Sequence, residues 1–200
     1  MVNSSLLQLP PGDFAGYIFD LDGTLAASMG LHFRAWKKAL ADNGAKIDFT
    51  WELLVAHGGR STQYFVELLN REHGENLDAR RVARDQDAIL AEIHHTVEAV
   101  PEVFAFAKNL AEHNIPRAIA SGGTREAVGR TLAYIGAKHL FDVVVTVEDV
   151  IHGKPAPDIF LLAAKRLGVA PQKCLVLGDS VLDIEGAKAA GMAWVKLEPQ

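Results

Sequence analysis

Five short apolar runs, separated by segments with helical periodicity, constrain the fold of this chain more than any other feature. Each run is apolar on both faces, which is typical of a strand buried in a parallel sheet with helices on either side. Strands that alternate with helices of this length form βαβ units. The sequence therefore predicts an α/β fold with a doubly wound parallel sheet, whose strands are Ala15–Phe19, Arg117–Ala120, Val143–Val147, Cys174–Leu177 and Ala193–Leu197, with helices at Arg125–Ile135, Asp158–Leu167 and Asp183–Ala190.

The connection between the first two strands is too long for a simple crossover, which needs only about a dozen residues and one helix. The segment 28–100 contains helical patterns and no convincing strand; the patterns are Leu31–Asn43, Thr50–Ala56, Ser61–His73 and Leu77–His95. Pro101 then begins a further helix, Glu102–His113, because proline is tolerated in a first turn. We expect residues 1–27 and 101–200 to form the core, and residues 28–100 to form an inserted all-α helical-bundle cap over its site.

The composition argues against several classes of partner. A formal net charge of −5 disfavours nucleic acid or an anionic membrane as the main partner, but allows a local positive pocket for a small anion. Cys174 is the one cysteine, so no disulfide forms within the chain, which fits a reducing cytoplasm. The first residues do not resemble a signal peptide, and no stretch approaches the about 18 apolar residues of a membrane span. We therefore expect a cytoplasmic protein without membrane association, as a monomer or weak dimer.

Polar residues follow four of the five predicted strands. In open α/β sheets, ligands bind beyond the carboxyl ends of the strands, so residues that follow different strands meet there. The first strand leads into Y-I-F-D-L-D-G-T-L, and the later ones into S-G-G, H-G-K-P-A-P-D and L-G-D-S-V-L-D. The residues delivered to this edge are Asp20, Asp22, Ser121, Gly122, Gly123, Lys154, Asp179 and Asp183.

This set of residues indicates a metal-assisted phosphate site. Clustered carboxylates repel one another unless a cation lies among them, and a few hard oxygen ligands favour Mg²⁺. A hydroxyl group, glycine amides and a lysine can hold phosphate oxygens. We assign Asp20 as a nucleophile that forms an aspartyl-phosphate, and Asp22 as the general acid and base. Taken singly, Ser121 could instead cap a helix, Lys154 could be a surface residue and Asp179 a turn residue.

The four motifs together resemble those of the haloacid dehalogenase superfamily, in the branch with a helical cap inserted after the first motif. They are D-L-D-G-T (Asp20 to Thr24), Ser121, Lys154 in G-K-P-A-P-D, and G-D-S-V-L-D (Asp179 to Asp183). The resemblance implies a Rossmann-like core and a Mg²⁺ site. Its implied ligands are the carboxylates of Asp20 and Asp179 and the backbone carbonyl of Asp22. It also implies phosphate binding by Ser121, the Gly122 amide and Lys154, with Thr24 and Asp183 as supporting residues.

Two further segments, H-F-R-A-W (His32–Trp36) and K-P-A-P-D-I-F (Lys154–Phe160), resemble β-phosphoglucomutases and related sugar-phosphate phosphatases. Many relatives carry an aspartate after the first motif where this chain has Ala27, which concerns how the cap linker is held. The cap loop H-G-G-R-S-T supplies Arg60 as a candidate substrate contact, and His32 is a second one. His94 and His95 are adjacent on a helix, so they cannot share one face, and no further zinc-ligating residues accompany them. We therefore assign neither to the site.

We predict a Mg²⁺-dependent phosphatase that acts on a small phosphorylated metabolite, and we favour a sugar phosphate. Two alternatives stay open: a β-phosphoglucomutase-like isomerase that uses the same aspartates, and a non-catalytic phosphate-binding regulatory protein. The resemblance favours hydrolysis over isomerisation, because mutases of this kind tend to carry an acidic residue before the metal aspartate, where this chain has Gly178. His32 keeps the mutase alternative open, because a histidine there could assist Asp22.

Overall fold

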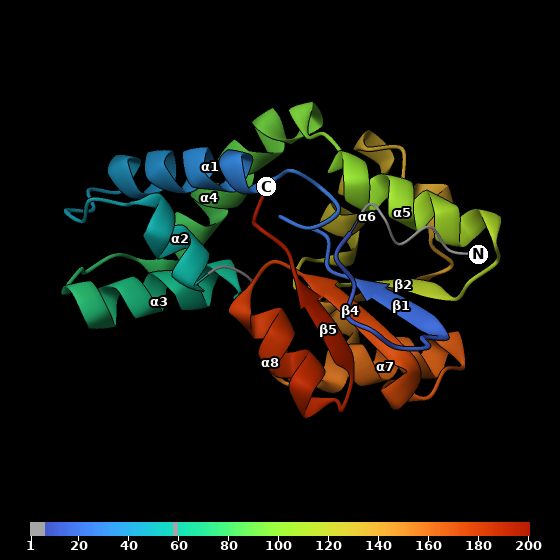
Figure 1. Ribbon diagram of the computed structural model, residues 1–200. Helices are drawn as coiled ribbons and strands as arrows, with labels where there is room; N and C mark the ends of the chain where they lie inside the picture. The colour runs from blue at the N-terminus through green and yellow to red at the C-terminus, as the bar shows by residue number, and fades with distance from the viewer. Residues whose placement is uncertain (1–6, 58–59) are drawn as a thin grey trace.

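The structure, a computed structural model, describes residues 7–57 and 60–200, which form two lobes (Figure 1). The larger lobe is built on the predicted five-stranded parallel sheet, and its strand order is β3-β2-β1-β4-β5. In the central strand, Phe19 pairs in register with Ile119 on one side and Leu177 on the other, so the strands end at one level. The strands are β1 (Gly16–Phe19), β2 (Arg117–Ser121), β3 (Val143–Thr146), β4 (Cys174–Gly178) and β5 (Ala193–Lys196).

Helices cover both faces of this sheet, which confirms the doubly wound arrangement (Figure 1). One face packs against α5 (Pro101–Glu112) and α6 (Arg125–Tyr134), and the other against α7 (Asp158–Leu167) and α8 (Val181–Ala189). The side chains of β1 alternate between the two cores: Tyr17 and Phe19 enter the first, and Ile18 enters the second. Burial on both faces is the reason that this strand is an unbroken apolar run.

The second lobe is helical and is inserted between β1 and β2 (Figure 1). It contains α1 (Met29–Asp42), α2 (Trp51–His57), α3 (Thr62–His73) and α4 (Ala79–Ile93), followed by the short η2 (His94–Thr96). It has its own hydrophobic core, in which Trp36 packs edge-on against Phe65 with ring centroids 4.7 Å apart. The helical insertion predicted from the sequence is therefore present, while its boundaries at 27/28 and 100/101 stay a prediction.

The two segments that join the lobes run antiparallel and are hydrogen-bonded to each other. The amide of Ala27 donates to the carbonyl of Glu98 at 2.8 Å, and the amide of Val100 donates to the carbonyl of Leu25 at 2.9 Å. An isolated bridge pairs Ala26 with Ala99 between them. Backbone hydrogen bonds therefore hold the linker at Ala27, where many relatives carry an aspartate.

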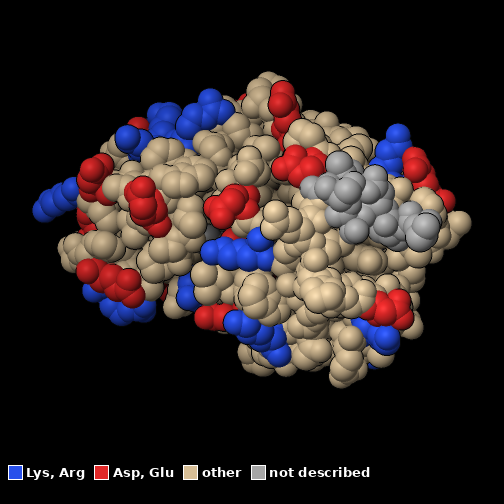
Figure 2. Space-filling model, viewed as in Figure 1, with Lys and Arg blue, Asp and Glu red and all other residues tan. Residues whose placement is uncertain are grey.

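Charged side chains of both signs are interspersed on the face drawn in Figure 2, with acidic and basic residues beside one another on both lobes. Within the described part of the chain, no helix is long and apolar enough to cross a membrane.

Candidate active site

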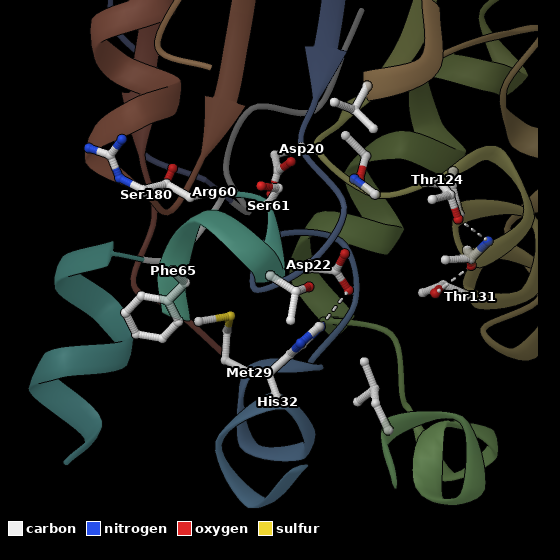
Figure 3. Close-up of a pocket in the computed structure, with 18 of the residues that line it drawn as sticks. Asp20, Asp22, Met29, His32, Arg60, Ser61, Phe65, Thr124, Thr131 and Ser180 are labelled. Carbon is white, nitrogen blue, oxygen red and sulfur yellow. Dashed lines mark hydrogen bonds and ion pairs between the residues drawn. The ribbon is translucent and has the colours of Figure 1, made fainter. Parts of the chain in front are cut away.

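The carboxyl edge of the sheet brings the residues predicted from the strand ends together. Asp20 follows β1, Ser121 ends β2 and Asp179 follows β4, and all three line one cavity of about 400 Å³ between the lobes. Lys154, from the segment between β3 and α7, lines the same cavity. In Figure 3, Asp20 and Asp22 lie in the middle of this site, with Phe65 of the helical lobe on one side and Thr124 of the core on the other.

Lys154 connects two of the carboxylates. Its ammonium nitrogen lies 2.6 Å from Oδ1 of Asp20 and 2.5 Å from Oδ1 of Asp183. Although burial alone would favour the neutral amine, the charges of Asp183 and Asp20 raise the pKa of Lys154 above its usual value. Lys154 is therefore a buried cation directed at the edge of the sheet and is not a surface lysine.

Three buried carboxylates form a group that can hold a metal ion. One oxygen from each of Asp20, Asp179 and Asp183 lies within 4.8 Å of the others. Three carboxylates against one ammonium group leave two formal negative charges, which a divalent cation would balance. Burial, reinforced by the charges of the neighbouring carboxylates, raises the pKa of Asp20 well above its ordinary range and that of Asp179 to about 6. The residues present therefore fit a divalent metal.

Two glycines make room for these carboxylates. Gly23 has a φ of +82°, and a Cβ built there would lie 2.5 Å from Oδ2 of Asp179. A Cβ at Gly178 would lie 2.5 Å from the Cβ of Asp183. The hydroxyl of Thr24 donates a 2.8 Å hydrogen bond to Oδ1 of Asp179, which fixes that carboxylate from the other side.

Asp22 lies in a different environment from Asp20. Its Oδ1 accepts a hydrogen bond of 2.7 Å from the hydroxyl of Ser28, and Nε2 of His32 lies 3.5 Å away (Figure 3). Burial acts to raise the pKa of Asp22, but the contacts with His32 and Ser28 outweigh it and lower the pKa to about 2. Since Ser28 and His32 lie at the start of the helical lobe, the predicted substrate contact His32 touches the predicted acid–base residue directly.

Ser121 is the last residue of β2 and not a helix cap. Its hydroxyl oxygen accepts a hydrogen bond of 3.1 Å from the amide of Gly123, which makes a tight turn of S-G-G. The cap of α6 is Thr124, whose side chain accepts from the amide of Ala127. Ser121, Gly122 and Gly123 all line the cavity that contains Asp20, and within the turn the Gly123 amide is taken up by the Ser121 hydroxyl oxygen.

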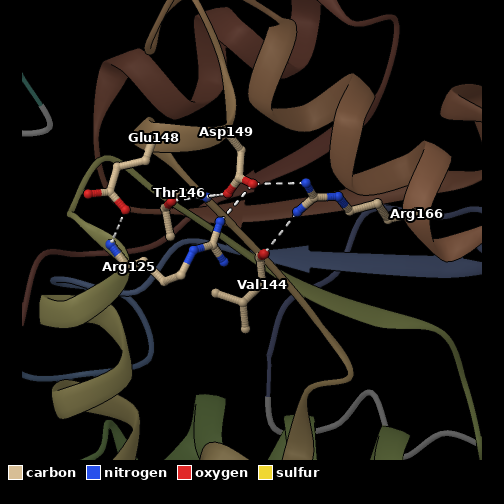
Figure 4. Close-up of polar contacts among 6 residues, drawn as sticks. All are labelled: Arg125, Val144, Thr146, Glu148, Asp149 and Arg166. Atoms are coloured by element: carbon tan, nitrogen blue, oxygen red, sulfur yellow. Dashed lines mark hydrogen bonds and ion pairs between the residues drawn. The ribbon is translucent and has the colours of Figure 1, made fainter.

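A separate ionic cluster fixes the start of α6 behind this turn (Figure 4). Asp149 accepts hydrogen bonds from Arg125 at 2.7 Å, from Arg166 at 2.8 Å and from the amide of Thr146 at 2.9 Å. Burial opposes ionisation, but these donors hold the pKa of Asp149 far below its usual range. The amide of Arg125 also donates to Glu148 at 3.1 Å. The cluster joins β3, α6 and α7.

Arg60 is the second predicted substrate contact, and it lines the cavity from the helical lobe. Its guanidinium carbon lies 5.1 Å from the centre of the Tyr64 ring, and its side chain is exposed. Two other members of its loop, Gly58 and Gly59, lie outside the described residues.

The cavity also contains residues that the sequence interpretation missed. Gln86, Leu90 and His94 all line it, and they occur at intervals of four residues along α4 and its extension. The hydroxyl of Thr131 is hydrogen-bonded to Nε2 of His94 at 2.9 Å and lies 3.1 Å from the carbonyl of Ala127. His94 therefore lies in the wall of the cavity, a position that its exclusion as a zinc ligand did not address. One signal in the sequence could have identified this side of the cavity. Gln86 and His94 are polar, but they fall at the same four-residue spacing as the apolar Val82 and Leu90.

Comparison of the sequence with known proteins finds relatives that are hydrolases and phosphatases. The sequence model of the haloacid dehalogenase-like hydrolases matches residues 14–191. Fructose-1-phosphate phosphatase YqaB from Escherichia coli (strain K12) is 34% identical over 180 residues, which are 90% of this chain and 94% of that protein. Hexitol phosphatase A from the same organism is 31% identical over 176 residues, which are 88% of this chain and 79% of that protein.

Solved structures of related proteins have a similar fold. CbbY from Rhodobacter sphaeroides in complex with phosphate has a TM-score of 0.77 and 25% identity, covering 94% of this chain and 87% of that chain. A hydrolase from Pseudomonas syringae has a TM-score of 0.79 and 30% identity, covering 91% of this chain and 84% of that chain. The chain belongs to the haloacid dehalogenase-like hydrolases, as the resemblance implied. Within that family it lies in the branch of the sugar-phosphate phosphatases, and it is a phosphoric monoester hydrolase.

Proposed function

We propose that this protein is a Mg²⁺-dependent phosphatase that hydrolyses a small sugar phosphate through an aspartyl-phosphate on Asp20. The observation that carries the proposal is the position of Asp20. It contacts Lys154 at 2.6 Å, and it belongs with Asp179 to the cluster of buried carboxylates that lines the cavity. The names of two relatives, a fructose-1-phosphate phosphatase and a hexitol phosphatase, support a phosphorylated sugar or polyol as the substrate.

In the first half-reaction, an oxygen of Asp20 attacks phosphorus, and the bond from phosphorus to the sugar oxygen breaks. The Ser121 hydroxyl, the Gly122 amide and Lys154 bind the phosphate oxygens and orient the group. Asp22 donates a proton to the leaving sugar oxygen. The contacts with His32 and Ser28 lower the pKa of Asp22 to about 2, so Asp22 takes up the proton that it donates within the complex with substrate, where the phosphate charge raises the pKa of a nearby carboxyl.

In the second half-reaction, the Asp22 carboxylate accepts a proton from water, whose oxygen attacks phosphorus as the bond to Asp20 breaks. Free phosphate and the original carboxylate of Asp20 result. The carboxylates of Asp20 and Asp179 and the backbone carbonyl of Asp22 would hold Mg²⁺. The bound ion would supply positive charge that stabilises the transferring phosphoryl group. Asp183 holds Lys154 in place through the contact described above.

The mutase alternative has one observation in its favour, the contact of His32 with Asp22. Two others support hydrolysis instead. A side chain at Gly178 would collide with Asp183, so an acidic residue there would require Asp183 to move. Besides Arg60, the arginine that lines the cavity in the described part of the chain is Arg130, and it is paired with Glu126 at 2.7 Å and so is less available for a second phosphate.

The test is phosphate release from a panel of sugar phosphates in the presence of Mg²⁺, with fructose 1-phosphate and a hexitol phosphate included. Substantial release from at least one member supports the proposal. In a second reaction, β-glucose 1-phosphate is incubated with a trace of the glucose bisphosphate. Conversion mainly to glucose 6-phosphate with little free phosphate would establish the mutase in place of the phosphatase.

A further inference from the structure

Helix α4 carries a polar side chain on its buried face. Val82 is 0% exposed and belongs to the core of the helical lobe, and Gln86, one turn later, is 2% exposed. Leu90 follows after another turn on the same face and packs against the core of the larger lobe. A stripe of this kind is expected to be apolar throughout, so the glutamine requires a specific reason.

The amide nitrogen of Gln86 has no hydrogen-bond partner among residues 7–57 and 60–200. A buried donor without a partner loses its hydrogen bonds to water and gains nothing in return, so such groups are rare in folded proteins. Gln86 also lines the cavity that contains Asp20 and Asp22. A group bound in this cavity could therefore supply the missing partner.

The chemistry of the surrounding wall indicates what that group is. A carboxamide is neutral and can both donate and accept hydrogen bonds, which suits a hydroxyl group. Asp87, the next residue, also lines the cavity, and its carboxylate can accept from hydroxyls but repels a second phosphate. Arg60 and Arg130 line the cavity too, with the partners already described.

We propose that the Gln86 carboxamide binds a hydroxyl group of the substrate's carbon chain and thereby selects polyhydroxylated phosphate monoesters over other monoesters. This inference rests on the proposed phosphatase function. It adds Gln86 as the residue that recognises the sugar part of the substrate, which is the leaving group. It also explains why the helix buries an amide: the bound substrate satisfies it. The cost falls on the free enzyme, where the donor has no partner within residues 7–57 and 60–200.

The experiment replaces the amide with an apolar side chain of similar length, Gln86→Met, and uses Gln86→Leu as a second variant. The matched control is Gln63→Met, because Gln63 is an exposed glutamine of α3 that pairs with Glu67 and does not line the cavity. Two substrates are compared, fructose 1-phosphate, which has several hydroxyls, and p-nitrophenyl phosphate, whose leaving group has none. Each variant is also unfolded in urea to measure its stability.

We expect Gln86→Met to lower kcat/KM for fructose 1-phosphate about 10-fold relative to p-nitrophenyl phosphate, as loss of one uncharged hydrogen bond predicts. The urea midpoint should stay the same or rise, because an unpaired buried amide has been removed. Gln63→Met should change neither the ratio of the kcat/KM values for the two substrates nor the midpoint of urea unfolding. An equal loss on both substrates, or no loss on either, from both Gln86 variants would overturn the inference while leaving the phosphatase intact. If the wild-type protein released no phosphate from any member of the sugar-phosphate panel or from p-nitrophenyl phosphate, the proposed function would fail, and the inference with it.

Discussion

The ammonium group of Lys154 is held against Asp183, whose Oδ1 lies 2.5 Å away, while the other oxygen of the same carboxylate caps helix α8. The second oxygen accepts from the hydroxyl of Ser180 at 2.5 Å and from its amide at 3.2 Å. One buried carboxylate therefore connects the first turn of a helix to the cation of the active site. Its substitution should affect both folding and turnover.

Asp183→Asn should lower kcat/KM about 10- to 100-fold, in line with the loss of other groups that orient a primary ligand. It should also reduce the free energy of unfolding by about 1–3 kcal/mol, because the capping box and the buried ion pair are both weakened. Phosphate-release kinetics and urea unfolding measure the two effects. Glu185→Gln on the exposed face of α8 is the control. Full activity in Asp183→Asn would show that Lys154 does not depend on this contact.

Asp20→Asn keeps the size of the side chain but removes the attacking oxygen anion. We expect turnover to fall by at least about 10³-fold, because the covalent step is lost. The control is Asp13→Asn, since the Asp13 side chain is 100% exposed and lies away from the site. Phosphate release near the wild-type rate from Asp20→Asn would remove this residue as the nucleophile.

Removal of divalent metal should abolish activity, because the carboxylate group around Lys154 is left with uncompensated negative charge. Adding Mg²⁺ back should restore it. Ca²⁺ should support little turnover, since its larger and less regular coordination misplaces the reacting groups. The assay is phosphate release in excess chelator, followed by titration with each ion. Full activity in chelator, with no metal detected by elemental analysis, would contradict a metal-dependent mechanism.

Arg60→Ala should alter the ranking of substrates more than it alters stability. The side chain is exposed and rests on Tyr64, so its loss should change the free energy of unfolding by no more than about 0.5 kcal/mol. The measurement is kcat/KM across a panel of sugar phosphates, combined with thermal unfolding. The same order of preference in wild type and variant would exclude Arg60 from substrate recognition.

Asp149→Asn should destabilise the protein by about 2 kcal/mol at pH 7, because two arginines lose their charged acceptor. The native pKa of Asp149 lies below its unfolded value, so its contribution is fully present above the unfolded pKa of about 4 and is lost as the pH falls toward the native pKa. Urea unfolding of wild type and variant at pH 7 and pH 3 should show a smaller difference at pH 3. Asp142→Asn, at an exposed position just before β3, is the control. A difference that grew on acidification would contradict the argument.

The strands were predictable to within about a residue at most ends, because burial on both faces leaves them as apolar runs. Helix α8 begins at Val181 and not at Asp183, since Ser180 and Asp183 form a capping box whose S-V-L-D pattern was interpreted only as a motif. The core residues of the site were predictable because strand ends meet at one edge. Gln86 and His94 were not, because they belong to the helical lobe. How that lobe lies over the sheet depends on packing between segments distant in sequence.

The paired linkers also limit how the helical lobe can move. Residues 25–27 and 98–100 are joined through their backbones, and Ser28, the next residue, is hydrogen-bonded to Asp22. Because the two linker segments are hydrogen-bonded side by side, we expect the helical lobe to move by rotation about the pair, a motion that keeps the backbone bonds between them. Such a rotation would move Ser28 and His32 relative to Asp22. We therefore expect opening of the cavity to change the hydrogen bonding of Asp22, the proposed acid–base residue.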